Sequence, residues 1–205
     1  MDGESACTAA ALRALYGAPS ELSLKKQLTR LDPHCRRFIA LSPFLVLATV
    51  GKDGLPDASP RGDAPGFVAV LDDETLLVPD RRGNNRLDSL QNVAEQSGVG
   101  LIFFVPGINE TLRVNGHARI TTDAALLARF AVDGKVPRTG LLVAVKEVYY
   151  HCAKALIRAK LWDSSRHIAR KEFPSLGRIL ADQIAGTDAA TTEQTIAEGY
   201  RERLY

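Results

Sequence analysis

The stretch SPRGDAPGFVAVLDDETLLVPDRRGNNRLDSL, residues 59–90, contains two short apolar runs separated by an acidic segment. The runs cover residues 66–71 and 75–79, and the acidic segment DDE joins them. Two short apolar runs with a tight polar connection predict a β-hairpin. The hairpin would bring two basic corners together, one around Arg61 and one at residues 79–86.

The first corner is Arg61-Gly62-Asp63, which follows a proline at the end of a predicted strand. Arginine presents a planar fork of donors that suits a phosphate group. Glycine lets a ligand approach the backbone closely. A plain turn with a surface arginine is the alternative interpretation, and an adhesive Arg-Gly-Asp loop is a third.

The second corner, PDRRGNNR at 79–86, leaves a strand and enters a predicted helix over residues 86–96, with Asn84 or Asn85 as N-cap. A helix N-terminus exposes free N–H groups and the positive end of the helix dipole, which favours anions. A capped helix with exposed charges is the alternative, and the spacing of a P-loop is missing. Because Arg61 lies one hairpin upstream, we favour a phosphate site.

Further strands are predicted over residues 43–50, 55–61, 99–106, 110–122 and 140–152. The run 43–50 lacks alternation, which predicts burial on both of its faces. Gly116 predicts a bulge where its strand bends. About six strands joined mostly by hairpins predict a mainly β fold, an antiparallel barrel with peripheral helices. The βαβ units that a Rossmann sheet needs are absent.

Helices are predicted on both sides of this barrel. Residues 1–42 would hold an Ala-rich helix, a second helix over 21–31, and a third that starts at Asp32-Pro33, with Asp as N-cap and Pro as the first helical residue. Residues 151–205 would hold the C-terminal helices. With the barrel at 43–150 and no linker-like segment, we expect residues 1–205 to form a single domain.

The composition limits the possible partners. Lys plus Arg total 26 against 24 acidic residues, a formal net charge of +2, which is too balanced for bulk nucleic-acid binding. No apolar run approaches the roughly 20 residues that span a bilayer. The acidic N-terminus lacks the features of a signal peptide. We therefore expect a cytoplasmic protein without a nucleic-acid or membrane partner.

The cysteines and histidines do not predict a metal site. Three cysteines, Cys7, Cys35 and Cys152, are far apart in the sequence and form no CxxC pair. His34-Cys35 and His151-Cys152 are adjacent pairs, and adjacent residues of a regular element point in different directions. We expect reduced thiols and no metal ion.

Two more segments carry candidate ligand-binding side chains. The strand around Thr111 and Arg113 has polar groups on one face, which suits a ligand groove or an ordinary solvated sheet face. Lys154 and Arg158 are four residues apart and share a helix face, which Trp162 would extend. A basic surface helix with a half-buried tryptophan is the alternative. No nucleophile elbow, HExxH or kinase motif is present, so an enzyme of this sequence needs a cofactor for its chemistry.

Residues 43–162 resemble the pyridoxamine 5'-phosphate oxidase-related FMN-binding proteins, which share the flavin split barrel. The segments that carry the resemblance are SPRGDAPGFVAVLDD, LLVPDRRGNNRLDSL, GINETLRVNGHARI and YYHCAKALIRAKLW. The resemblance implies a six-stranded antiparallel barrel and a homodimer with two FMN molecules at its interface.

The resemblance also assigns roles to individual residues. Arg61 matches a phosphate-binding arginine, and Asn85-Arg86 stands where the family usually has Arg-Lys, so that Arg81 or Arg82 would compensate. Thr111 replaces a family glutamine. The Arg-rich pyridoxal-phosphate signature is not reproduced, so vitamin B6 oxidation is not expected. The full set of expected cofactor-binding residues is Ser59, Arg61, Gly62, Asp63, Val78, Pro79, Asp80, Arg81, Asn85, Arg86, Thr111, Arg113, Lys154 and Arg158, with Val78, Pro79 and Asp80 lining the flavin ring.

The function expected from this resemblance is that of an FMN-dependent oxidoreductase acting on a small molecule. One alternative is an FMN-binding carrier or redox sensor without turnover. Another is the same barrel with deazaflavin F420 or haem in place of FMN. The residues do not identify the catalytic groups, the substrate or the electron donor.

Overall fold

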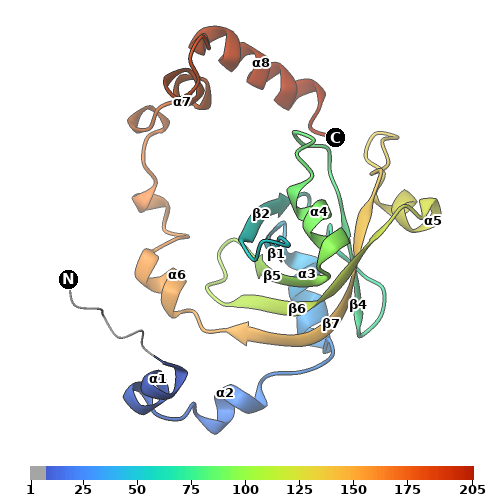
Figure 1. The fold of residues 1–205 in the computed structure, drawn as a ribbon, viewed down its shortest axis with the longest axis vertical. Coiled ribbons are helices and arrows are strands. Elements are labelled where there is room, and N and C mark those ends of the chain that lie inside the picture. The colour runs from blue at the N-terminus through green and yellow to red at the C-terminus, as the bar shows by residue number, and fades with distance from the viewer. Residues whose placement is uncertain (1–7) are drawn as a thin grey trace.

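The computed structural model describes residues 8–205 (Figure 1). Residues 1–7, which include Cys7 and the start of the predicted Ala-rich helix, lie outside the described residues. Three helices precede the sheet: α1 (Ala9–Tyr16), α2 (Glu21–Lys25) and α3 (Pro33–Leu41).

The starts of these helices follow the sequence more closely than their ends. Asp32 caps α3 as predicted, because its Oδ1 accepts a hydrogen bond from the N–H of Cys35 at 2.7 Å. The helix predicted over 21–31 ends at Lys25 instead. Its second half is extended because Leu28 pairs with Val148 in a β-bridge.

Seven strands form one antiparallel sheet in the order β2-β1-β5-β6-β7-β4-β3. The strands are β1 (Phe44–Val50), β2 (Pro56–Gly62), β3 (Ala69–Val70), β4 (Thr75–Pro79), β5 (Gly98–Phe104), β6 (Thr111–Thr121) and β7 (Gly140–His151). The predicted number of six is one too low. The predicted hairpin around residues 72–74 is confirmed, with Ala69 opposite Leu77, and its first strand, β3, is only two residues long.

The sheet curls into a split barrel whose interior is the apolar core (Figure 1). Leu45 and Leu47 of β1, Phe103 of β5, and Leu112 and Val114 of β6 are fully buried there. The inner face of α3 packs against this core, and α4 (Asp88–Glu95) packs against β1 and β6. The barrel is therefore held by side chains from most of its strands.

The remaining helical elements lie after β6. They are α5 (Ala124–Leu127) and the 3₁₀ turn η1 (Ala128–Phe130) before β7, then α6 (Lys154–Ala159), η2 (Ser164–Arg166), η3 (Arg170–Glu172), α7 (Leu176–Gln183) and α8 (Ala189–Glu202). In Figure 1 the elements after α6 bend away from the barrel, and the end of α8 returns to it. We call residues 162–205 the C-terminal arm.

Strand β1 differs from the expectation of burial on both faces. Leu45, Leu47 and Thr49 are buried, whereas Phe44 and Ala48 are exposed. Within one chain, β1 therefore has one covered face and one open apolar face.

Gly116 lies where the register between β6 and β7 shifts, so the predicted bulge is confirmed. Asn115 pairs with Glu147, whereas Gly116 pairs with Val145. A Cβ atom at Gly116 would lie 2.1 Å from the carbonyl oxygen of Ala144. Glycine is required because the partner atom belongs to the backbone and cannot rotate away.

We expect Gly116→Ala to lower the free energy of unfolding by about 2–3 kcal/mol, because the added methyl group must displace the backbone of β7. Gly98→Ala is the matched control, since a Cβ atom at that position meets nothing within 4 Å. Urea unfolding of both variants measures the difference. Equal losses of stability would contradict the close approach at Gly116.

Candidate functional site

The two edges of the sheet meet through side chains. Strand β2 is one edge, and β4 lies next to the other. Asp80 directly follows β4. Arg61, on β2, donates a hydrogen bond from Nη1 to Oδ1 of Asp80 at 2.7 Å. The Arg61 side chain is only 19% exposed. This ion pair links the two halves of the barrel, and we call the junction the seam.

A second ion pair crosses the seam with its charges reversed. Arg81, next to Asp80, donates from Nε to Oδ2 of Asp63 at 2.6 Å. Arg81 also donates from Nη1 to the carbonyl oxygen of Phe130 at 2.7 Å. Each side of the seam therefore carries one arginine and one aspartate, Arg61 and Asp63 on one side and Asp80 and Arg81 on the other. Both ion pairs across the seam form at the same time.

Asp63 is the most buried member of the seam, with 4% of its side chain exposed. Its burial opposes ionisation, but hydrogen bonds from the Ala64 N–H, the Tyr205 hydroxyl and Arg81 outweigh it, so the pKa of Asp63 lies below its ordinary value. The Tyr205 hydroxyl donates at 2.9 Å, and the Tyr205 ring lies 5.1 Å from the Arg81 guanidinium. Tyr205 is thereby anchored on the seam.

A cavity of about 1060 Å³ lies along the seam. Eight of the fourteen predicted cofactor-binding residues line it: Ser59, Arg61, Gly62, Pro79, Asp80, Arg81, Asn85 and Arg86. Apolar wall comes from Phe67 and Leu90. The two basic corners of the sequence therefore do come together, as the hairpin predicted.

The second corner differs in conformation from the prediction. Helix α4 begins at Asp88, and Leu87 occupies the N-cap position without a side-chain cap. Asn85 and Leu87 both have left-handed backbones, with φ of 59° and 62°, which interrupt the helix. Asn84 accepts a hydrogen bond from the N–H of Arg86 at 3.1 Å and forms a local turn instead of an N-cap. Residues 80–87 are thus a loop, and the anion argument from a helix N-terminus at Asn85 is wrong.

The charges that line the cavity favour an anion. Among the described residues, six basic side chains line it against three carboxylates, those of Asp57, Asp80 and Asp88. Each carboxylate has a hydrogen-bond partner: Ser89, Arg61 and Arg86 respectively. Three of the cations that line the cavity have no carboxylate within ion-pair distance among residues 8–205. They are Arg82, Lys135 and Arg138.

Arg61 retains an unused donor despite its ion pair. Its Nε is buried and has no hydrogen-bond partner in the described chain. A buried charged donor without a partner is costly. An acceptor bound in the cavity would remove this cost.

Lys135, Arg138 and Tyr205 line the cavity but were not predicted from the sequence. The first two reach it because Pro79 pairs with Gly140, so the segment before β7 lies beside the loop after β4. The Asp80 N–H donates to the carbonyl oxygen of Thr139 at 3.0 Å. In the sequence, Lys135 and Arg138 are visible only as two basic residues in a segment that contains Gly and Pro. Their place at the cavity can be inferred only when the pairing of β4 with β7 is known.

Six predicted residues lie outside this cavity: Asp63, Val78, Thr111, Arg113, Lys154 and Arg158. Val78 and Thr111 are buried within the sheet. The Arg113 guanidinium lies 5.3 Å from the ring of Tyr149. Lys154 and Arg158 share α6 as predicted.

Trp162 does not extend the face of α6. The helix ends at Ala159, and Lys160 turns the chain with a left-handed backbone. The indole Nε1 of Trp162 instead donates to the carbonyl oxygen of Ile108 at 2.9 Å. The side chain therefore anchors the chain against the β5–β6 turn.

The remaining titratable groups form no metal-binding cluster in the part of the chain that the structure describes. No group of three or more His, Cys, Asp or Glu side chains there could hold a metal ion. Burial raises the pKa of the Cys35 thiol to about 12, so this thiol stays protonated in the core.

Between residues 8 and 205, no helix has both the length and the apolar character that a bilayer crossing requires.

The fold and the site define a split β-barrel with a cation-lined cavity at its seam. The chain belongs to the pyridoxamine 5'-phosphate oxidase family, because residues 31–152, more than half of its length, match the model of that family. No curated protein matches the sequence.

Several solved structures resemble the chain at low sequence identity. HupZ from Group A Streptococcus is 17% identical over 58% of this chain and 93% of its own, with a TM-score of 0.48. A pyridoxamine 5'-phosphate oxidase candidate from Lactobacillus delbrueckii is 22% identical over 60% and 98%, with a TM-score of 0.46. An FMN-binding protein from Syntrophomonas wolfei is 12% identical over 57% and 83%, with a TM-score of 0.46.

We expect Asp63→Asn to cost about 2 kcal/mol or more of stability at pH 6, because it leaves the Arg81 charge of a mostly buried pair uncompensated. The control Glu74→Gln removes the exposed pair with Arg30 and should cost less than about 1 kcal/mol. Urea unfolding at pH 6 compares the two variants. Similar losses would contradict a structural role of the seam.

The cost of Asp63→Asn should depend on pH in one direction. Because the folded state lowers the pKa of Asp63, its stabilising effect is complete above the unfolded pKa of about 3.9 and is lost as the pH falls through the lower folded value. The gap between wild type and variant should therefore shrink from pH 6 to pH 3. If the stability difference between wild type and variant instead increases as the pH falls, the folded state does not lower the pKa of Asp63.

Proposed function

We propose that the chain binds FMN in the seam cavity and is an FMN-dependent oxidoreductase for a small molecule. The observation that carries the cofactor assignment is the buried Nε of Arg61, a charged donor without a partner on the cavity wall. A phosphate group offers the acceptor oxygens that this donor lacks. Membership of the pyridoxamine 5'-phosphate oxidase family supports the same ligand.

The lining of the cavity fits the group. Its volume of about 1060 Å³ is slightly above the usual range for ligand pockets, about 300–1,000 Å³. The cations come from three chain segments: Arg61 from β2, Arg86 from the loop after β4, and Lys135 and Arg138 from the segment before β7. Pro79 and Phe67 give apolar surface that suits a flat ring. Bound FMN would supply hydride-transfer chemistry, which the side chains of this cavity do not.

The residues of the seam would act by binding and orientation. Asp80 holds Arg61 in place from across the seam, and Arg86 would add a second charge to a phosphate. Arg82 is exposed on the same loop and has no ion-pair partner among the described residues, which supports its proposed compensation for the family arginine that Asn85 replaces. Proton movement at a substrate would fall to Lys135 or water, because the three carboxylates of the cavity already accept hydrogen bonds and an arginine does not give up its proton.

That engagement of all three carboxylates also favours the second candidate, an FMN-binding carrier or redox sensor without turnover. Reduction of the bound flavin by NADH or NADPH, followed by reoxidation with a substrate, separates an enzyme from a carrier. For haem the support is weaker, because the cavity wall formed by the described residues contains no His, Cys or Met, and the Tyr205 hydroxyl is engaged by Asp63.

We propose that the protein is a homodimer with the cofactor at its interface. An outer apolar face supports this: Phe44, Val46 and Ala48 of β1, Ala58 and Pro60 of β2, and Ile102 and Phe104 of β5 share one side of the sheet by their register. The Phe44 and Phe104 rings lie 6.1 Å apart on it. A partner that covers this face would explain why the β1 sequence lacks alternation. It would also let Arg113, Lys154 and Arg158 serve the cavity of the other copy, whereas Thr111 is buried within its own sheet.

Cofactor identification tests the proposal directly. Purified protein should be yellow, and mass spectrometry of the ligand released by denaturation should give FMN. If F420 or haem is released instead, the proposed cofactor is wrong but the cavity remains its proposed binding site. Protein that is colourless and does not bind added FMN would overturn the proposal.

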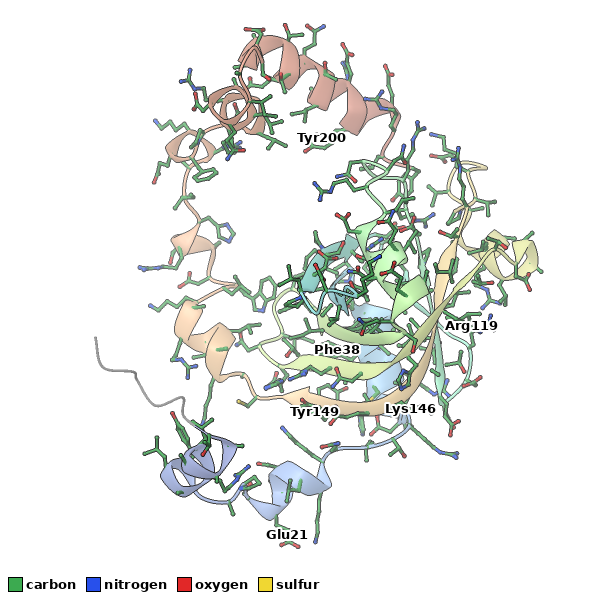
Figure 2. The ribbon with its side chains drawn as sticks, in the orientation of Figure 1. Glu21, Phe38, Arg119, Lys146, Tyr149 and Tyr200 are labelled. Atoms are coloured by element: carbon green, nitrogen blue, oxygen red, sulfur yellow. The ribbon has the colours of Figure 1, made fainter. Side chains whose placement is uncertain are left out.

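We expect Arg61→Ala and Arg86→Ala each to weaken FMN binding by about 1.5–3 kcal/mol, or about 10–150-fold in Kd, because each removes a charged phosphate contact. Quenching of flavin fluorescence on titration measures the affinity. Arg119→Ala is the control, since this exposed arginine of β6 lies on the far side of the barrel from the arm (Figure 2) and does not line the cavity.

Arg61→Ala also leaves Asp80 without its partner. Thermal unfolding of the cofactor-free variants therefore accompanies the titration, so that a loss of affinity in folded protein is distinguished from unfolding. Variants that stay folded and bind FMN as tightly as the parent would show that the phosphate lies elsewhere.

A further inference from the structure

The C-terminal arm is attached to the barrel at both ends. At its start, Trp162 donates a hydrogen bond to the carbonyl oxygen of Ile108. At its end, Tyr205 contacts Asp63 and Arg81 on the seam. The arm is therefore held in place rather than loosely appended.

Between these anchors the arm has almost no core of its own. Gly177 is its one buried residue. There α7 and α8 cross so closely that a Cβ atom on Gly177 would lie 2.3 Å from Cγ of Glu193. The packing of α7 on α8 is thus the internal contact of the arm, and it leaves both helices open on their other sides.

Large apolar side chains of the arm are exposed along its length. Between 47% and 66% of each of the following is accessible: Ile168, Phe173, Leu176, Ile184, Tyr200 and Leu204. Ordering a residue costs about 1–2 kcal/mol of backbone entropy, which burial of apolar surface must offset. The chain by itself does not provide that burial, so these side chains need a partner surface.

The arm bends around an open space beside the β2 edge of the barrel (Figure 1). Figure 2 shows that side chains leave this space empty, and that Tyr200 lies on the side of α8 that faces it. The outer apolar face, which begins on β2 and continues over β1 and β5, lies at the same edge of the sheet.

We infer that the arm clasps a second copy of this chain, whose barrel occupies the open space with its outer apolar face against the arm. The inference rests on the homodimer of the proposed function and adds the arm to its interface. One twofold contact would cover both open surfaces, because each copy offers an apolar sheet face and an arm. The arm has six basic and seven acidic residues, a balance that suits neither nucleic acid nor an anionic membrane.

The clasp would also complete the cavity. The arm ends at Tyr205, which lines the cavity wall, and Pro60 belongs both to that wall and to the outer apolar face. A barrel held in the arm would therefore lie against the open side of the partner's cofactor site. Loss of the clasp should weaken FMN binding as well as the dimer.

The test uses three variants of the full chain in sedimentation equilibrium. Phe173→Asp/Ile184→Asp alters the arm, Ala48→Arg alters the outer apolar face, and Leu55→Asp alters an exposed apolar residue in the β1–β2 turn as the control. The first two should each raise the dimer Kd about 30-fold or more. The control should stay within about threefold of the parent, as for an energetically neutral position.

The outcomes separate the clasp from the dimer. A parent protein that is monomeric at all concentrations overturns both. If Ala48→Arg breaks the dimer and the arm variant does not, the homodimer stands and the clasp is wrong. Circular dichroism of the arm variant checks that its barrel is folded.

A second measurement tests which barrel the arm holds. Isotope-labelled and unlabelled copies are refolded together and treated with an amine-reactive cross-linker. Cross-links from Lys171 of the arm to Lys52 or another barrel lysine should join a labelled copy to an unlabelled one. Cross-links found solely within one copy would show that the arm folds onto its own barrel and would overturn the inference.

Discussion

The two reciprocal ion pairs of the seam, Arg61 with Asp80 and Asp63 with Arg81, join the two edges of the curled sheet. A sheet with free edges exposes unpaired backbone groups, and a full barrel removes them by closing the ladder. Here β2 cannot supply a complete ladder, because Pro56 and Pro60 lack an N–H. Side chains close the gap instead, and they leave room between the edges that a backbone ladder would fill.

The cavity follows from this mode of closure. Each arginine of the seam is matched by an aspartate, so the ion pairs themselves contribute little net charge. The positive excess comes from the loops that flank the seam, through Arg82, Lys135 and Arg138. Contact between the sheet edges and excess positive charge are therefore divided between different residues. Arg61 pairs with Asp80 through Nη1, and its Nε has no partner among the described residues.

Local features of this fold could be predicted from the sequence, because short-range chemistry determines them. The β3–β4 hairpin, the Asp32 cap and the bulge at Gly116 are examples. The start of α4 could not, since Leu87 adopts a left-handed backbone that its residue type disfavours. The place of Lys135 and Arg138 depends on the pairing of β4 with β7, which no local pattern indicates. The open face of β1 was missed because its sequence fits a strand covered on both sides.

The strand order has a consequence for how the protein folds. The β3–β4 hairpin is local, but it joins the sheet only through β7, where Pro79 meets Gly140. Contacts between distant segments form late, because loop closure must precede them. The seam needs both sheet edges in place, so we expect the chain to assemble it after the rest of the barrel. A ligand of the seam would consequently bind the completed fold alone, and it would slow unfolding rather than speed folding.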